Sequence, residues 1–376
     1  MSRPSRRPKL PAQKPPRRPL ARPKLPPTPE TPEHLCEADV AEGLERIAFS
    51  ELRRRFGENV ERLDRGEARP GALRFSYAGN LYHLLGLRMA QAVYLVRRFD
   101  VPRPKALLGH QHFTALLAMI AAVRDLSPAE AYQTLTLNAA GSDSSVMRRL
   151  KDELAAATGL KPADEGDLLI RLRHPPGDPS AWEVLVRLSP RPLATRSWRV
   201  CSREGALNAA IAGAMVFLTQ PKPDDVFLNL LCGSGTLLIE RLALENAASA
   251  AGYDLDETAL ACARRNIEAA GLADRVSLNL GDARALPLPD KSVDAICADL
   301  PFGHLVGSHE GNLELYPELL REAARLLKPG GRAVFISHEV RLMENLLADS
   351  PRWKIEQIIK VAQGGLNPRI FVLVRV

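Results

Sequence analysis

Short apolar runs alternate with amphipathic stretches from Gly205 to the end of the chain. Apolar runs between turn signals are typical of strands in a covered sheet, and apolar residues at three- and four-residue spacing are typical of helices. The pattern predicts strands over residues 226–231, 250–253, 276–280, 293–298, 333–337, 354–361 and 369–376. It predicts helices over residues 206–218, 236–247, 257–270, 315–327 and 340–347, with Lys328 to Gly331 closing the fourth of these.

Strands that alternate with helices indicate a largely parallel, doubly wound sheet whose ligands bind beyond the carboxyl ends of the strands. The last two predicted strands have only the loop 363–368 between them, so we expect them to be antiparallel. A doubly wound sheet that ends in a reversed hairpin is typical of S-adenosylmethionine-dependent methyltransferases rather than of a plain dinucleotide-binding fold. Residues 205–376 are therefore predicted to form an α/β, Rossmann-like class I methyltransferase domain.

The first half of the chain has a weaker pattern. Residues 101–199 alternate between predicted helices (112–124 and 144–158) and predicted strands (133–138, 167–173 and 182–188), which indicates a second α/β domain. Residues 35–100 contain helical patterns, such as 44–49, but no strong motif, and we treat them as an N-terminal linker domain. No internal repeat is visible.

Composition narrows the class of protein. The chain has 376 residues, 45% of them hydrophobic, which is enough for two domains with ordinary cores. Its longest apolar stretches fall short of the roughly 20 residues of a membrane span, and no apolar signal region follows the N-terminus. The five cysteines include no C-x-x-C pair, which argues against a zinc site or a disulfide framework. A cytoplasmic protein without a metal or a membrane partner is expected.

The net charge of +7 comes from one end of the chain. Residues 1–29 hold nine Lys or Arg, ten Pro and no acid. Residues 1–34 are therefore predicted to be a disordered, basic, proline-rich tail, which samples extended states. Such an arm gains affinity for nucleic acid by counterion release, and it can equally be a solubilising tail with no dedicated partner.

A glycine turn, Cys232 to Thr236, separates the first predicted strand from the helix that follows it. Glycines at such a turn let a ligand approach the backbone closely, and Ser234 and Thr236 place hydroxyls at a helix N-terminus. A phosphate-binding P-loop is disfavoured because no Lys follows at the required spacing.

Two acids follow the next two predicted strands. Asp254 lies about 20 residues beyond the glycine turn, where a carboxylate can accept hydrogen bonds from a ribose diol. Asp282 can take an adenine amino group. Asp256, also near the second strand, suits the N-cap of the helix that begins at Glu257. Taken singly, each acid is more often a helix cap or a loop residue. The glycine turn and the two acids, however, each follow a successive predicted strand, and this common placement favours a shared site.

The more specific signal is Asp299-Leu300-Pro301-Phe302-Gly303, directly after the predicted strand 293–298. An exocyclic amine on a base is a poor nucleophile because its lone pair is delocalised into the ring. The Asp299 carboxylate and the Leu300 carbonyl can hold both amino hydrogens and aim that lone pair at a methyl group. Pro301 rigidifies the turn, and Phe302 can stack on the ring.

These motifs carry a resemblance to a known family. Residues 205–376 resemble the catalytic domain of the THUMP-domain RNA methyltransferases that form N2-methylguanosine in tRNA. The matching features are the glycine turn followed by Ile239-Glu240, the Asp299 to Gly303 loop, the Leu315-Tyr316 pair and Gly364-Gly365-Leu366. Residues 101–199 resemble the THUMP module more loosely, with 134–143 as a strand and an RNA-facing turn, and residues 35–100 correspond to a ferredoxin-like linker.

The resemblance implies a guanine-N2 methyltransferase that uses S-adenosylmethionine and acts on RNA, most simply on tRNA. It implies catalytic roles for Asp299, Leu300, Pro301 and Phe302. Arg196 and Arg199, in a basic stretch before the catalytic domain, are implied to bind RNA. The implied cofactor-binding residues are Asn229, Cys232, Gly233, Ser234, Gly235, Thr236, Asp254, Leu255, Asp282 and Ala283.

The sequence departs from the family at Asn229-Leu230, where an Asp-Pro pair is usual. Asn keeps an acceptor but loses the charge that favours the cofactor's ammonium group. Two alternatives therefore remain: an enzyme on the same scaffold that methylates adenine N6 or a ribosomal guanine, and an RNA-binding protein whose catalytic domain is inactive. The modified nucleotide and the oligomeric state are not readable from the sequence.

Overall fold

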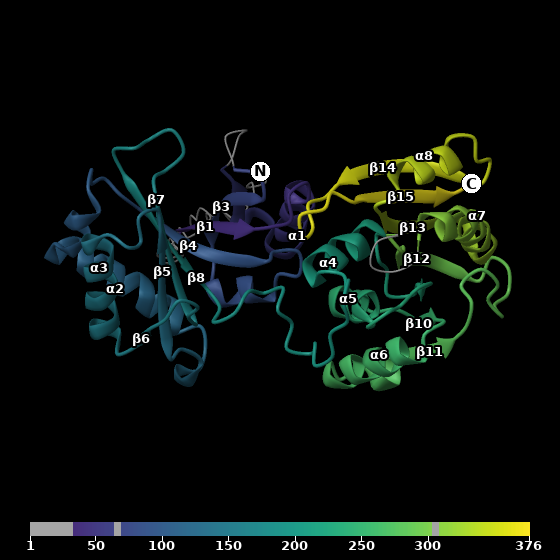
Figure 1. Cartoon of the computed structure of the whole chain (residues 1–376), viewed down its shortest axis with the longest axis horizontal. Coiled ribbons are helices and arrows are strands. Elements are labelled where there is room, and N and C mark those ends of the chain that lie inside the picture. Colours follow the sequence, from purple (N-terminus) through teal and green to yellow (C-terminus); the bar gives the residue numbers. More distant parts are fainter. Residues whose placement is uncertain (1–32, 64–68, 303–307) are drawn as a thin grey trace, which may run out of the picture. The chain divides into compact units, whose positions relative to one another are not determined.

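The computed structural model describes residues 33–63, 69–302 and 308–376, and its strands form two sheets (Figure 1). Most of the predicted basic tail, 1–34, lies outside the described residues, as does Gly303 of the predicted catalytic loop. Within the described ranges, no helix combines the length and the apolar character that a membrane crossing requires.

The first sheet takes its strands from residues 33–187. The elements are β1 (Glu33–Asp39), α1 (Glu45–Phe56), β2 (Val60–Arg62), β3 (Ala72–Ala78), β4 (Ala92–Phe99), α2 (His110–Arg124), β5 (Thr134–Ala139), α3 (Ser145–Thr158), β6 (Lys161–Pro162), β7 (Leu168–Arg173) and β8 (Trp182–Arg187). Short 3-10 turns lie at Gly57–Asn59, Leu81–Gly86, Pro104–Leu108 and Ala129–Ala131. The strand order is β2-β3-β1-β4-β8-β7-β5-β6.

The centre of this sheet joins the two predicted N-terminal domains. Strands β4 and β8 are antiparallel, with Tyr94 opposite Arg187 and Phe99 opposite Trp182. The sequence predicts separate domains at 35–100 and 101–199, whereas the structure joins both ranges through one hydrogen-bonded ladder. The strands of residues 35–100 carry no clear alternation, because β3 and β4 are buried along most of their length.

The second sheet belongs to the predicted catalytic domain. Its elements are α4 (Ala209–Leu218), β9 (Val226–Asn229), α5 (Thr236–Leu244), β10 (Ser249–Asp254), α6 (Glu257–Ala269), a 3-10 turn (Ala273–Arg275), β11 (Val276–Leu280), β12 (Val293–Asp299), α7 (His309–Leu326), β13 (Leu327–Ser337), α8 (Val340–Ala348), β14 (Trp353–Lys360) and β15 (Arg369–Arg375). The order is β11-β10-β9-β12-β13-β15-β14.

The predicted doubly wound sheet with a reversed end is confirmed. Strands β11, β10, β9, β12 and β13 pair in parallel, and β15 runs antiparallel to both β13 and β14. Helix α4 is apolar on all sides and is buried at nearly every position, as expected of a helix covered by other elements.

Two boundaries differ from the prediction. Helix α7 begins at His309 rather than at residue 315, because the Ser308 hydroxyl caps it by accepting a hydrogen bond from the Gly311 amide (3.1 Å). Pro317, which suits a first helical turn, lies inside the helix instead. Strand β13 begins at Leu327, but residues 328–331 have no partner on β12: Leu327 lies opposite Val293, and the regular pairing resumes with Arg332 opposite Ala295.

Candidate active site

The loops that carry the predicted chemistry follow neighbouring strands. On β9, Asn229 pairs with Gly252 of β10 on one side and with Cys297 of β12 on the other. The chain leaves β9 toward β10 and returns later to β12, so the order of strands reverses between β9 and β12. In open α/β sheets, ligands bind at the carboxyl edge beside such a switch point.

The glycine turn has the geometry that its residues require. Gly233 and Gly235 have φ values of +51° and +81°, a region that glycine adopts without steric cost. A Cβ at Gly235 would lie 3.3 Å from the Cβ of Ala263 on α6, whereas a Cβ at Gly233 would meet no described atom within 4 Å. Gly235 therefore lets α5 pack on α6, and the open side of the turn is at Gly233.

Asp254 joins this turn to the end of β10. Its Oδ2 accepts a hydrogen bond from the Gly233 amide (2.8 Å), and its Oδ1 accepts one from the Asp256 amide (3.0 Å). The side chain of Asp256 caps α6, as predicted, by accepting from the Thr258 amide (2.8 Å). Hydrogen bonds from Thr258 and from Arg203 lower the pKa of Asp256 to about 2. Asp254 remains the half-buried acid nearest the turn.

Asn229 is fully buried between two strands. Its Nδ2 donates to the Cys297 carbonyl (3.0 Å) and to the Leu231 carbonyl (3.4 Å). Its Oδ1 is buried and accepts no hydrogen bond from any described residue. The amide therefore links β9 to β12 through its nitrogen, and no donor among the described residues reaches its oxygen.

The other predicted cofactor residues have different environments. Ser234 and Thr236 are buried with their hydroxyl oxygens 3.3 Å apart, and the thiol of Cys232 is buried, which raises its pKa. Leu255 is 61% exposed, so it offers an open apolar surface beside Asp254. The guanidinium of Arg284 lies 2.6 Å from the Asp282 carboxylate and lowers its pKa, and Ala283 is buried.

Asp299 ends β12 at the same edge. Its Oδ1 is buried and makes no hydrogen bond within the described part of the chain. Burial raises the pKa of Asp299 to about 7. The amide of the next residue, Leu300, donates to the Ile336 carbonyl of β13 (3.0 Å), so the start of the loop is fixed by the sheet. A buried acceptor without a donor is costly, which makes Asp299 a candidate functional group.

The loop is also held from α7. The Pro301 carbonyl accepts hydrogen bonds from Asn312 Nδ2 (3.0 Å) and from the Tyr316 hydroxyl (2.8 Å). The Tyr316 and Ser337 hydroxyls are 2.8 Å apart, and all three of these side chains are buried. Sequence reasoning identified only Tyr316, as part of a family pattern. Asn312 and Ser337 have no local signal, because their partners are distant in sequence.

Phe302 is half-buried beside the ring of His338, with the ring centres 4.3 Å apart and the planes at 75°. His309 Nδ1 lies 2.9 Å from Glu339 Oε1, and hydrogen bonding to Glu339 raises the pKa of His309. These residues place aromatic rings and charged groups beside the end of β12, and sequence reasoning had singled out only Phe302 among them.

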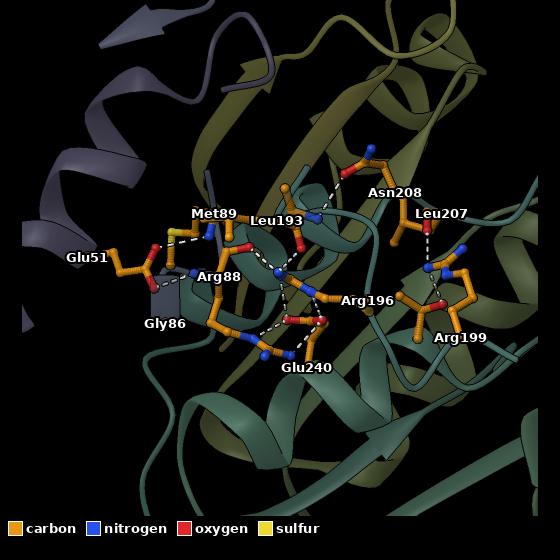
Figure 2. Close-up of polar contacts among 12 residues, drawn as sticks. Glu51, Gly86, Arg88, Met89, Leu193, Arg196, Arg199, Leu207, Asn208 and Glu240 are labelled. Carbon is orange, nitrogen blue, oxygen red and sulfur yellow. Dashed lines mark hydrogen bonds and ion pairs between the residues drawn. The ribbon is translucent and has the colours of Figure 1, made fainter. Parts of the chain in front are cut away.

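The two arginines predicted to bind RNA make hydrogen bonds within the protein, although Arg199 is only half-buried (Figure 2). Arg196 is buried, and its guanidinium contacts Glu240 and the carbonyls of Leu193 and Arg88. Arg199 Nη2 donates to the Leu207 carbonyl (2.9 Å) and to Thr236 Oγ1 (3.1 Å). The prediction that they face RNA is therefore corrected: they connect residues 188–208 to the catalytic domain.

One disulfide was not anticipated. Cys201 and Cys262 are bonded, with their Cα atoms 5.5 Å apart, although no C-x-x-C spacing pointed to them. The other three cysteines are free and buried. The expectation of no disulfide is therefore corrected, because cysteines that are distant in sequence can meet once the chain folds. Asn266 of α6 contacts Cys201 N and O (both 2.9 Å) and the Ser234 carbonyl (3.0 Å).

Comparisons with known proteins agree with this geometry. Residues 196–369 match the UPF0020 family model, described as an RMKL-like methyltransferase domain. A tRNA (guanine(6)-N2)-methyltransferase from Thermus thermophilus is 31% identical over 345 residues, which are 90% of this chain and 98% of the relative. The mouse tRNA (guanine(6)-N(2))-methyltransferase THUMP3 is 31% identical over 45% of this chain, which spans only 36% of that longer protein.

A solved structure extends the likeness to the N-terminal half. The crystal structure of TrmN from Thermus thermophilus aligns with a TM-score of 0.68 and 29% identity, covering 91% of this chain and 99% of that one. The similarity therefore includes both sheets and the connection between them.

Proposed function

Because this chain belongs to the family of tRNA guanine-N2-methyltransferases, we propose that it transfers a methyl group from S-adenosylmethionine to the exocyclic N2 amine of a guanine in RNA, with tRNA as the substrate. The observation that carries the proposal is the buried, unpartnered Oδ1 of Asp299 at the end of β12. It lies at the same sheet edge as the glycine turn and Asp254.

The chain is a methyltransferase that depends on S-adenosylmethionine, and its residues fit that cofactor. Asp254 can accept hydrogen bonds from the ribose diol, and the exposed face of Leu255 can pack on the adenine. The unpartnered Oδ1 of Asn229 is an acceptor for the ammonium group, and the open side of Gly233 leaves room for the methionine chain. When bound, the cofactor supplies an electrophilic methyl group on a sulfonium.

The proposed work of the loop is to orient the amine. Asp299 and the Leu300 carbonyl accept the two amino hydrogens, which turns the nitrogen lone pair out of the ring toward the methyl group. With the cofactor bound, its methyl group would pass from the sulfur to this nitrogen, and the proton that the nitrogen then loses would go to Asp299 or to water. The half-buried ring of Phe302 stacks on the base, which must first leave any helix to reach this position.

Because Arg196 is buried, its guanidinium cannot reach a phosphate, and we propose another place for the RNA. A cavity of about 460 Å³ on the first sheet is lined by Arg69, Arg171 and Arg173, which pair with Asp39 at the cavity and with the buried Glu37 beside it. Residues 138–140, within the turn expected to face RNA, also line it. We propose that phosphates of the RNA bind at this cavity, because arginines bind phosphate in a fork geometry.

A labelled methyl donor tests the proposal directly. The purified chain is incubated with total tRNA and, separately, with ribosomal RNA, and the nucleosides are analysed. We expect N2-methylguanosine in tRNA. Asp299→Ala should lower the rate by about a hundredfold or more and leave the affinity for S-adenosylmethionine unchanged.

The exposed Asp349→Ala is the matched control. Methylation of adenine N6 or of ribosomal guanine would favour the first alternative enzyme. Failure to bind S-adenosylmethionine in calorimetry would favour an inactive RNA-binding protein, and turnover of Asp299→Ala within a few-fold of wild type would reject the role of that residue.

A further inference from the structure

Glu240 on α5 is completely buried and binds two arginines from outside the catalytic sheet (Figure 2). Its carboxylate accepts from Arg88 Nε (2.9 Å) and Nη2 (2.8 Å). It also accepts from Arg196 Nε (2.9 Å) and Nη2 (3.4 Å). Arg88 precedes β4 of the first sheet, and Arg196 lies in the connection that follows β8. One carboxylate therefore joins three segments.

The backbone at Arg88 and Met89 is also hydrogen-bonded to buried side chains. Its amide donates to Glu51 Oε1 on α1 (2.7 Å), and the amide of Met89 donates to Glu51 Oε2 (2.9 Å). Its carbonyl accepts from Arg196 Nη2 (2.6 Å). A Cβ at Gly213 of α4 would lie 3.1 Å from this carbonyl, so a larger residue there would press on the carbonyl oxygen. The segment around Arg88 thus has one fixed place against the catalytic domain.

The same helix is tied to the cofactor turn. Helix α5 begins at Thr236, the last residue of the turn, and Glu240 is about one helical turn later on the same face. Arg199 binds Thr236 Oγ1 and Arg196 binds Glu240, so the connection 188–208 contacts α5 at two successive turns. A change in the position of Glu240 relative to Arg88 is therefore also a change relative to the cofactor turn.

Such a cluster is not explained by stability alone. Desolvation of buried charges offsets most of their attraction, and apolar side chains of similar size often stabilise a fold as well. A buried charge is strongly destabilising when it is separated from its partner. The ion pairs therefore penalise any arrangement in which Glu240 and its arginines are apart. The bidentate contacts of both arginines fix direction as well as distance.

We propose that Glu240, with Arg88 and Arg196, is a positioning residue that sets the first sheet at a fixed place against the cofactor helix, and so determines which guanine of a bound RNA reaches Asp299. This inference rests on the proposed function. Under this proposal, the distance between the RNA-binding first sheet and Asp299 selects the nucleotide, and the bases around the target are not read.

The test compares Glu240→Gln and Arg88→Gln with a matched control, Arg54→Gln. Arg54 forms an exposed ion pair with Glu245, the residue just after α5, 3.0 Å away, and so joins the same two parts of the chain. For each protein we would measure the affinity for S-adenosylmethionine, KM and kcat on folded tRNA, and the position of the methylated nucleotide. Spin labels at Lys105→Cys and Lys354→Cys, both exposed sites, report the distance between the two sheets.

In both cluster variants we expect affinity for S-adenosylmethionine within about twofold of wild type and a similar KM for tRNA. We expect kcat to fall about tenfold or more, or methylation to spread to neighbouring guanines, because bound RNA is no longer presented in register. The distance distribution should broaden. Arg54→Gln should behave as wild type, because exposed ion pairs contribute little.

Unchanged kcat, nucleotide position and distance in both cluster variants would overturn the proposal. If Glu240→Gln does not fold, Arg88→Gln still decides, because Glu240 keeps its contacts with Arg196 in that variant. If wild type methylates no RNA but the distance broadens in the variants, the positioning role holds and the proposed function fails. A loss confined to affinity for S-adenosylmethionine would assign Glu240 to cofactor binding and reject the proposal.

Discussion

The hydroxyl of Tyr316 donates a hydrogen bond to the carbonyl of Pro301 (2.8 Å). The two residues are 15 positions apart in the sequence, so only the fold brings them together. Asn312 binds the same carbonyl. The loop that follows Asp299 is therefore held by a helix that begins beyond it. A proline supplies no amide donor, so its carbonyl is the group by which a neighbouring element can hold it.

Tyr316→Phe should lower kcat by about tenfold and leave the affinity for S-adenosylmethionine unchanged, because one of two hydrogen bonds that fix the loop is lost. Steady-state kinetics and calorimetry measure the two quantities. Tyr82→Phe, at a 58% exposed tyrosine, is the matched control. A fall in cofactor affinity that matches the fall in kcat would place Tyr316 in the cofactor site instead.

The pH dependence should report Asp299. Burial raises its pKa to about 7, so the free enzyme should lose kcat/KM as the pH falls below about 7, where the carboxyl becomes protonated and is a poorer acceptor for the amino hydrogen. Hydrogen bonds from a bound amine favour the ionised form, so kcat should fall at lower pH than kcat/KM. A flat profile of kcat/KM between pH 5 and 8 would contradict this assignment.

The sign of the stability effect provides an independent check on Asp299. Its pKa is higher in the folded than in the unfolded chain, so its contribution to the free energy of unfolding is lost as the pH rises toward about 7. Asp299→Asn should therefore stabilise the protein more at pH 8 than at pH 5, as measured by urea unfolding. An equal effect at both values would mean that the carboxyl titrates normally.

Asn229→Asp should weaken the fold and the cofactor site together. The Asn229 amide donates to the carbonyls of Cys297 and Leu231, and an ionised carboxylate there would face two acceptors without a proton. We expect a loss of about 2 kcal/mol or more in the free energy of unfolding. Asn279→Asp on β11, whose amide binds only the Ser277 hydroxyl, is the matched control. Tighter binding of S-adenosylmethionine by Asn229→Asp would refute this reading of the amide.

Asp254→Ala should weaken S-adenosylmethionine binding by about tenfold or more, because the ribose diol would lose charge-assisted hydrogen bonds and the Gly233 amide would lose its acceptor. Calorimetry measures the effect against the exposed Asp274→Ala. Unchanged affinity would locate the cofactor away from the end of β10.

Reduction of the Cys201–Cys262 disulfide should lower the free energy of unfolding by about 4 kcal/mol, the order of magnitude for closing a loop of this length. Urea unfolding with and without a thiol reductant tests this, and Cys262→Ala should make the protein insensitive to the reductant. Equal unfolding midpoints of the wild type under both conditions would show that the bond does not form in solution.

The catalytic half was predictable because its signals are local. The strand Val276–Leu280 is as the pattern predicts, and Asp256 caps α6 as its place before Glu257 indicates. The start of α7 was missed because a Pro317 in the first turn satisfies local rules as well as Ser308 does. The roles of Arg196, Cys201 and Asn312 were not readable, because each has its partner in a distant segment.

The ladder between β4 and β8 also limits how this chain can be divided. A cut near residue 100 would strip a partner from a central strand and leave an open edge, which invites aggregation. Any division of the chain should therefore keep residues 33–187 together, because their strands form a single sheet.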